Sequence, residues 1–133
     1  LNDGMGEYVA SQVIKLMIDR DLKIKNASVL MLGVTFKENC PDVRNSKVLD
    51  VIGYLKEYGI TVDVYDPWVT EEDAEKLNVQ LWKTIPNKKY EAIVLAVSHN
   101  EFKTLDIDTL RKSESVVYDV KGQLPKHKRD KAL

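Results

Sequence analysis

Two basic residues, Lys37 and Arg44, lie in a polar loop that follows an apolar segment of the chain. Arg44 stands next to a predicted helix start, which offers free N–H groups and a partial positive charge. The two cations and the helix start together favour an anion such as a phosphate or a carboxylate. Phe36 precedes Lys37 and could lay its apolar face near a base or a sugar. The loop is therefore a candidate anion-binding site.

A structural role fits the same residues. Arg44 can pair with Asp42 or Glu38 to hold the loop, and Phe36 can belong to the core. Composition alone leaves both interpretations open. The loop lacks a G-x-G-x-x-G turn, since Gly33 is the only glycine there, so a dinucleotide pyrophosphate is not expected on it in the usual Rossmann manner.

Three further polar groups follow predicted strands, namely Asp66-Pro67, Ser98-His99-Asn100 and the segment 119–122. We expect Asp66 to form a turn or a helix cap before Pro67. We expect His99 to make a structural hydrogen bond rather than to act in catalysis.

The elements that must position these groups alternate between strands and helices. Strands are predicted over 28–34, 60–65, 91–97 and 115–120, with a short extended piece over 79–82. Helices are predicted over 4–20, 46–58, 70–77 and 101–112. The alternation predicts an α/β fold, a Rossmann-like doubly wound parallel sheet with helices on both faces, preceded by an N-terminal helix. Ligands bind such sheets outside the carboxyl ends of the strands, where the polar groups fall.

The sequence also indicates where the helices begin and end. Asn2 or Asp3 can cap the first helix and Asn45 or Ser46 the second, which Gly59 ends. Thr70 precedes an acidic first turn of the third helix.

The composition argues against several classes of function. The 133 residues suit one domain, and a net charge of -1 gives no reason to expect wholesale binding of nucleic acid or an anionic membrane. Neither a membrane span nor a signal peptide is expected. The single cysteine, Cys40, fits a reducing, cytoplasmic compartment, and a metal site is not expected. The start at Leu1 suggests a piece of a longer protein.

The loop and its surroundings resemble one family over nearly the whole chain. The stretch Leu-Gly-Val-Thr-Phe-Lys-Glu-Asn-Cys-Pro-Asp-Val-Arg-Asn-Ser, with Val-Tyr-Asp-Pro further on, is similar to the C-terminal domain of the UDP-glucose/GDP-mannose dehydrogenase family. Residues 91–103 and the ending Val-Tyr-Asp-Val-Lys-Gly also fit. The Glu-Asn-Cys-Pro-Asp form of the loop most resembles the UDP-N-acetylhexosamine branch.

The resemblance implies roles for four residues. Phe36 and Lys37 match positions that contact the UDP-sugar, and Arg44 matches a position that reaches the NAD cofactor across an interdomain cleft. Lys121 stands where relatives often have an arginine against the substrate, although lysine lacks the bidentate fork.

The resemblance also implies an organisation and an activity. Residues 1–20 would end an interdomain and dimerisation helix, and residues 21–133 would form the UDP-sugar-binding domain of a homodimeric enzyme whose N-terminal domain binds NAD. The intact enzyme would oxidise the C6 hydroxyl of a UDP-hexose or UDP-N-acetylhexosamine to a uronic acid for surface polysaccharides. The family's nucleophilic cysteine follows a Gly-rich segment that this chain lacks, so Cys40 is not matched to it and no catalytic residue is expected here.

Two other functions remain as alternatives. A non-catalytic module that binds a nucleotide as a regulator would share the same loop. A receiver-like signalling domain would place acidic residues at the end of the first strand, where this chain has Phe36 and Lys37.

Overall fold

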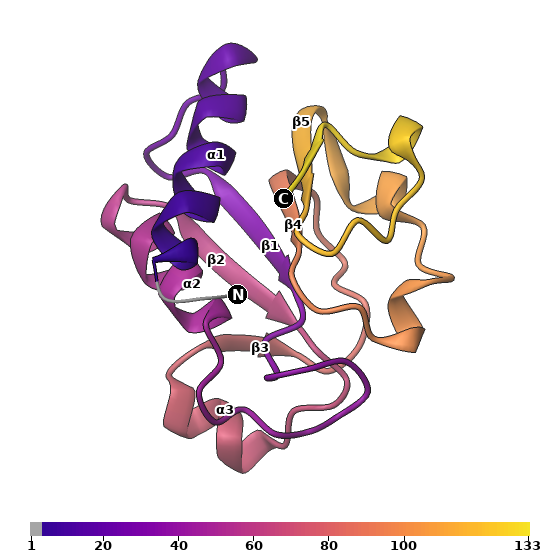
Figure 1. Ribbon diagram of the computed structural model, residues 1–133. Coiled ribbons are helices and arrows are strands. Elements are labelled where there is room, and N and C mark those ends of the chain that lie inside the picture. Colours follow the sequence, from indigo (N-terminus) through magenta and orange to yellow (C-terminus); the bar gives the residue numbers. More distant parts are fainter. Residues whose placement is uncertain (1–3) are drawn as a thin grey trace.

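One parallel sheet of six strands organises the computed structural model, which describes residues 4–133 (Figure 1). The strand order is β3-β2-β1-β4-β5-β6, and every neighbouring pair is parallel. The strands are β1 Ser28–Leu32, β2 Thr61–Tyr65, β3 Gln80–Trp82, β4 Tyr90–Leu95, β5 Arg111–Asp119 and β6 Lys131–Ala132. From the central β1–β4 pair the chain adds β2 and β3 on one side and β5 and β6 on the other, which confirms the doubly wound parallel sheet.

The α-helices of residues 4–133 pack on one face of this sheet. They are α1 Met5–Asp19, α2 Val48–Glu57 and α3 Glu71–Leu77. Their buried residues form one apolar cluster with Val29 and Met31 of β1. In Figure 1, α1 and α2 lie side by side. A Cβ atom at Gly6 of α1 would lie 2.6 Å from the Asp50 Cβ of α2, so glycine permits their close approach.

Helix ends match the sequence in part. The expected caps Asn2 and Asp3 lie outside the described residues. Thr70 caps α3 as expected, because its Oγ1 accepts a hydrogen bond from the N–H of Asp73 at 3.1 Å. Gly59 follows α2 with a φ of 80°, a value that glycine adopts freely.

The opposite face of the sheet is covered by two short 3-10 helices, η1 Asn100–Phe102 and η2 Ile107–Leu110. They bury Phe102 and Leu110 against a second apolar cluster that includes Leu30. The single helix expected over 101–112 is wrong. Asp106 has an extended backbone and caps η2 by accepting the Asp108 N–H, and β5 already begins at Arg111. A third 3-10 helix, η3 Lys126–Lys128, precedes β6.

Strand register sets the edge at which the polar loops leave the sheet. Leu32 of β1 pairs with Tyr65 of β2 and with Leu95 of β4. Leu95 in turn pairs with Asp119 of β5. The segments that follow these four strands therefore start side by side. Among the helices of residues 4–133, none is both long and apolar enough to cross a membrane.

Candidate functional site

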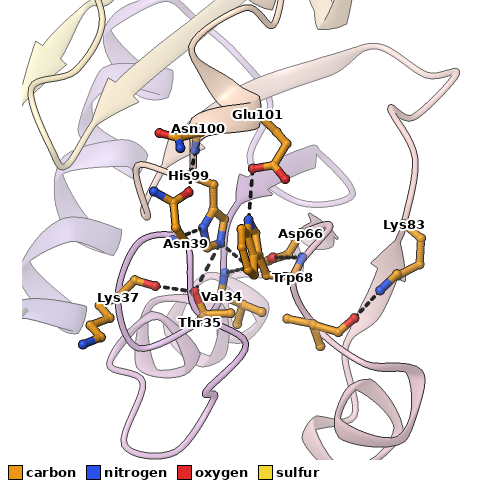
Figure 2. A network of polar contacts seen from close by, with 11 residues as sticks. Val34, Thr35, Lys37, Asn39, Asp66, Trp68, Lys83, His99, Asn100 and Glu101 are labelled. Atoms are coloured by element: carbon orange, nitrogen blue, oxygen red, sulfur yellow. Dashed lines mark hydrogen bonds and ion pairs between the residues drawn. The ribbon is translucent and has the colours of Figure 1, made fainter.

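The carboxylate of Asp66 joins the loops that follow β1, β2 and β4. It is fully buried. Its Oδ2 accepts the N–H of Val34 at 2.8 Å and lies 3.1 Å from Nε2 of His99. Its Oδ1 accepts the N–H of Trp68 at 2.8 Å, which confirms the expected turn around Pro67. Figure 2 shows these contacts meeting at one point.

His99 is also fully buried, and its hydrogen bonds define its protonation state. Nδ1 accepts the backbone N–H of Asn39 at 2.9 Å, so Nδ1 carries no proton. The single ring proton is then on Nε2, which faces Asp66 Oδ2 and, at 3.2 Å, Thr35 Oγ1. The ring contacts Trp68 and Phe102, with centroid distances of 6.0 and 5.4 Å. The structural hydrogen bond expected of His99 is confirmed.

Arg44 pairs with Asp42 at the exposed side of the loop. Nε donates to Oδ1 at 3.0 Å and Nη2 donates to Oδ2 at 3.1 Å. The side-chain and backbone hydrogen bonds from Arg44 lower the pKa of Asp42 from 3.8 to about 2. The Asp42 carbonyl also accepts the N–H of Phe36 at 2.7 Å, which closes the loop on itself. The loop-holding role of Arg44 is therefore present, although 85% of its side chain is still exposed.

Phe36 is not a core residue, because 57% of it is exposed. It lines a pocket of about 160 Å³ together with Lys121, Val97 and the start of α2. Lys121 is placed by Asp119, a buried carboxylate that accepts the Lys121 N–H at 3.2 Å and the Leu124 N–H at 2.7 Å. The structure thus brings Phe36 and Lys121 together from opposite ends of the sequence.

Lys37 lies beside this pocket rather than in its lining. Its carbonyl accepts a hydrogen bond from Thr35 Oγ1 at 2.9 Å, and its side chain points away from the buried network (Figure 2). The ammonium group is therefore presented on the outer side of the loop.

Ser46 is a pocket residue whose role the sequence did not reveal. Either Ser46 or Asn45 was expected to cap α2. Instead Lys47 occupies the cap position without a side-chain cap bond, and Asn45 has a φ of 59°. Ser46 is only 7% exposed, and within residues 4–133 its Oγ has no hydrogen-bond partner. A buried hydroxyl at a helix start and near Lys121 suits a ligand oxygen.

A larger hollow of about 800 Å³ lies elsewhere, between the early residues of β2 and β3. It is lined by Thr61, Gln80 and Trp82 among others and contains none of the predicted site residues. The smaller pocket is the better candidate because it lies at the carboxyl edge of the sheet, beside a helix start.

Comparison with known proteins decides the family. The profile described as the UDP binding domain of the UDP-glucose/GDP-mannose dehydrogenase family matches residues 30–126. The chain belongs to this family. Its candidate pocket and its loop from Thr35 to Ser46 both lie within the matched region.

Relatives of this dehydrogenase family match over the full chain. It is 47% identical to a UDP-N-acetyl-D-glucosamine 6-dehydrogenase of Pseudomonas aeruginosa and 41% identical to one of Salmonella typhi, in both cases over 100% of the chain. The chain spans 32% of the length of each of these two relatives.

A solved dehydrogenase shares the fold. The NDP-N-acetyl-D-galactosaminuronic acid dehydrogenase of Methanosarcina mazei Go1 superimposes with a TM-score of 0.83 at 22% identity. The match covers 93% of this chain and 26% of that one. The Rossmann-like architecture is confirmed by this neighbour.

Proposed function

We propose that the chain is the UDP-sugar-binding domain of an NAD-dependent 6-dehydrogenase. The enzyme would oxidise the C6 hydroxyl of a UDP-N-acetylhexosamine, or of a UDP-hexose, to the uronic acid used in surface polysaccharides. The observation that carries the proposal is the pocket in which Phe36 and Lys121 meet the start of α2. The names of the relatives from Pseudomonas aeruginosa and Salmonella typhi support the N-acetylhexosamine branch.

The pocket suits a nucleoside diphosphate by its chemistry. Phe36 offers an exposed aromatic face to a base or a sugar. Lys121, the Ser46 hydroxyl and the N–H groups of α2 offer positive charge and hydrogen bonds to phosphate oxygens. Lys37 follows Phe36 in the chain and lies beside the pocket, with its ammonium group on the outer side of the loop. Binding energy from the nucleotide would then orient the sugar for reaction in the rest of the enzyme.

NAD would be held mainly by an N-terminal domain, with Arg44 reaching it across a cleft. The exposed guanidinium fits this assignment, because Asp42 holds it from one side and leaves it presented to solvent. When bound, NAD supplies the hydride acceptor for the oxidation. In the longer enzyme, Arg44→Ala should raise the KM for NAD while changing the KM for the UDP-sugar by less than roughly twofold.

The N-terminal helix would continue a longer interdomain helix and take part in a homodimer. Its buried stripe packs within this domain, whereas Tyr8 and Ile18 remain 45% and 56% exposed. Two exposed apolar side chains on one helix are available for such a contact. A cytoplasmic location would suit the free thiol of Cys40.

The proposal is tested by titrating UDP into the ¹⁵N-labelled chain and following backbone amide shifts. Shifts should centre on Phe36, Lys37, Ser46 and Lys121, and inorganic phosphate alone should not reproduce them. Lys121→Ala should weaken UDP binding roughly tenfold, since it removes a charged hydrogen-bond donor. Lys23→Ala removes an exposed lysine before β1, at the opposite edge of the sheet, and serves as the matched control. Shifts that leave out Phe36, Lys37, Ser46 and Lys121, or equal losses in both variants, would refute the site.

A further inference from the structure

We propose that His99 is a positioning residue. Its neutral ring, protonated on Nε2, fixes the loop that carries Phe36 and Lys37 in the conformation that binds nucleotide. The inference rests on the proposed function, because the loop's ligand is the one assigned there. His99 would not contact the ligand and would act only through the loop.

The His99 ring contacts the loop on both sides of Phe36 and Lys37. Nε2 lies 3.2 Å from Thr35 Oγ1, and Nδ1 accepts the Asn39 N–H at 2.9 Å. Phe36 and Lys37 lie between these two points in the chain. The Asn39 side chain closes the arrangement, since its Oδ1 accepts the N–H of Asn100 at 2.8 Å (Figure 2).

Only one protonation state satisfies every partner. Thr35 Oγ1 gives its own proton to the Lys37 carbonyl, so toward His99 it can only accept. The Asp66 carboxylate likewise accepts, whereas the Asn39 N–H can only donate. A proton on Nδ1, whether in the doubly protonated ring or in the other neutral tautomer, would point at the Asn39 N–H. Two hydrogen-bond donors would then face each other. Glu101, the other carboxylate near the ring, accepts the Trp68 Nε1–H at 3.0 Å.

The loop needs such an anchor because it has little regular structure of its own. Between β1 and α2 the chain forms turns and bends, and it includes Asn39 and Asn45 with φ values of 54° and 59°. Ordering a loop of this kind during binding costs conformational entropy. A ring packed against Trp68 and Phe102 and hydrogen-bonded to buried Asp66 provides a rigid point that orders the loop beforehand.

Two variants separate the ring nitrogens. His99→Asn places a carbonyl oxygen near the position of Nδ1 and can still accept the Asn39 N–H. His99→Gln places an amide N–H near the position of Nε2 and can still donate to Asp66. The first variant keeps the contact with the Asn39 N–H of the loop, and the second keeps the contacts of Nε2 with Asp66 and Thr35.

The two variants should differ in which property they lose, UDP affinity or stability. His99→Gln should weaken UDP binding roughly fivefold, the loss of about one hydrogen bond, while His99→Asn should stay within about twofold of wild type. In urea unfolding His99→Asn should have the lower midpoint, because it leaves Asp66 without its ring donor. A merely structural His99 would lower affinity and midpoint together, and that pattern would overturn the proposal.

The wild-type chain provides a test that needs no folded variant. A long-range ¹H–¹⁵N spectrum at pH 7 should show Nδ1 of His99 unprotonated and Nε2 protonated. A proton on Nδ1 contradicts the proposal outright.

Loop order distinguishes this inference from the proposed function. Exchange of the Asn39 amide hydrogen, measured without ligand, should be slow in wild type and His99→Asn and fast in His99→Gln. If the wild-type chain fails to bind UDP, the proposed function fails, while this exchange pattern still decides whether His99 orders the loop. Equal exchange in all three proteins would remove the positioning role.

Discussion

Arg44 and Asp42 form a two-point ion pair, with Nε to Oδ1 at 3.0 Å and Nη2 to Oδ2 at 3.1 Å. The fork geometry fixes the guanidinium plane, which a lysine could not reproduce. The pair also closes a loop whose residues 36 and 42 are joined by a backbone hydrogen bond. Arg44 is therefore held in one orientation although 85% of its side chain is exposed.

The first prediction concerns the titration of Asp42. Its pKa is lowered from 3.8 to about 2 by the hydrogen bonds from Arg44, so the folded value lies below the unfolded one. The stabilisation from this pair is then present above about pH 4 and is lost as the pH falls toward 2. Arg44→Gln should move the midpoint of the Asp42 carboxyl ¹³C titration back toward 3.8, and Arg44→Lys should fall between. An unchanged midpoint in Arg44→Gln would show that the pair does not persist in solution.

The second prediction concerns the buried carboxylate of Asp66. Asp66→Asn should destabilise the chain by more than about 2 kcal/mol, because the new NH₂ group must face the N–H of Val34 or of Trp68. Asp21→Asn removes the same charge at an exposed position with a φ of 58°, which asparagine tolerates, and should stay within about 0.5 kcal/mol of wild type. Urea unfolding measures both. Similar losses in the two variants would show that Asp66 is not the junction of the three loops.

Much of the fold follows from local pattern. β1 and β4 each contain an unbroken run of four apolar residues, 29–32 and 92–95, and such runs form strands that are covered on both faces. The prediction of a single helix over 101–112 failed although the spacing of Phe102, Leu105 and Leu110 is compatible with a helix. The extended backbone of Asp106 divides it into two short turns, and this depends on packing against the sheet.

The candidate site was predictable only where sheet topology determines it. Phe36 and Lys121 follow strands whose carboxyl ends share an edge, so they could be expected near each other. The contacts of His99 with Thr35 and Asn39 join residues about sixty positions apart, and no local pattern encodes them. Serine is a common helix cap, so Ser46 was a reasonable candidate for capping α2. The backbone at Asn45 and Lys47 puts Lys47 in the cap position instead, and the sequence does not reveal this.

The third prediction compares two glycines. Gly33 follows β1 directly with a φ of 91°, and an added Cβ would lie 2.6 Å from the Val97 Cβ. Gly33→Ala should therefore cost roughly 3 kcal/mol through strain and overpacking combined. Gly53 lies in α2, and no atom of residues 4–133 would lie within 4 Å of its added Cβ, so Gly53→Ala should gain about 0.5–1 kcal/mol. Thermal unfolding of both variants checks the pair, and a stable Gly33→Ala chain would mean that β1 and the start of its loop can shift.

The fourth prediction concerns alkaline stability and Tyr90. This fully buried tyrosine donates a hydrogen bond from its hydroxyl to Asp63 Oδ2 at 2.7 Å. Burial, followed by the hydrogen bond to Asp63, raises the pKa of Tyr90 well above its ordinary value of 10.0. The folded value exceeds the unfolded one, so the stability linked to this proton is complete below pH 10 and is lost as the pH rises further.

Tyr90→Phe should accordingly change stability in two ways. At pH 7 it should lower the free energy of unfolding by about 1–2 kcal/mol, because Asp63 loses a buried donor and keeps, among the side chains of residues 4–133, the Lys88 ammonium group at 3.2 Å. Above pH 10 its stability should fall less steeply than that of wild type, by up to about 1.4 kcal/mol per pH unit, since one proton fewer is released on unfolding. Comparing the two proteins cancels the titration of groups that they share. Tyr58→Phe, which removes an exposed hydroxyl, should stay within about 0.5 kcal/mol of wild type at pH 7. Parallel stability curves for Tyr90→Phe and wild type between pH 10 and roughly 11.5 would mean that Tyr90 ionises in the folded chain as readily as in the unfolded one.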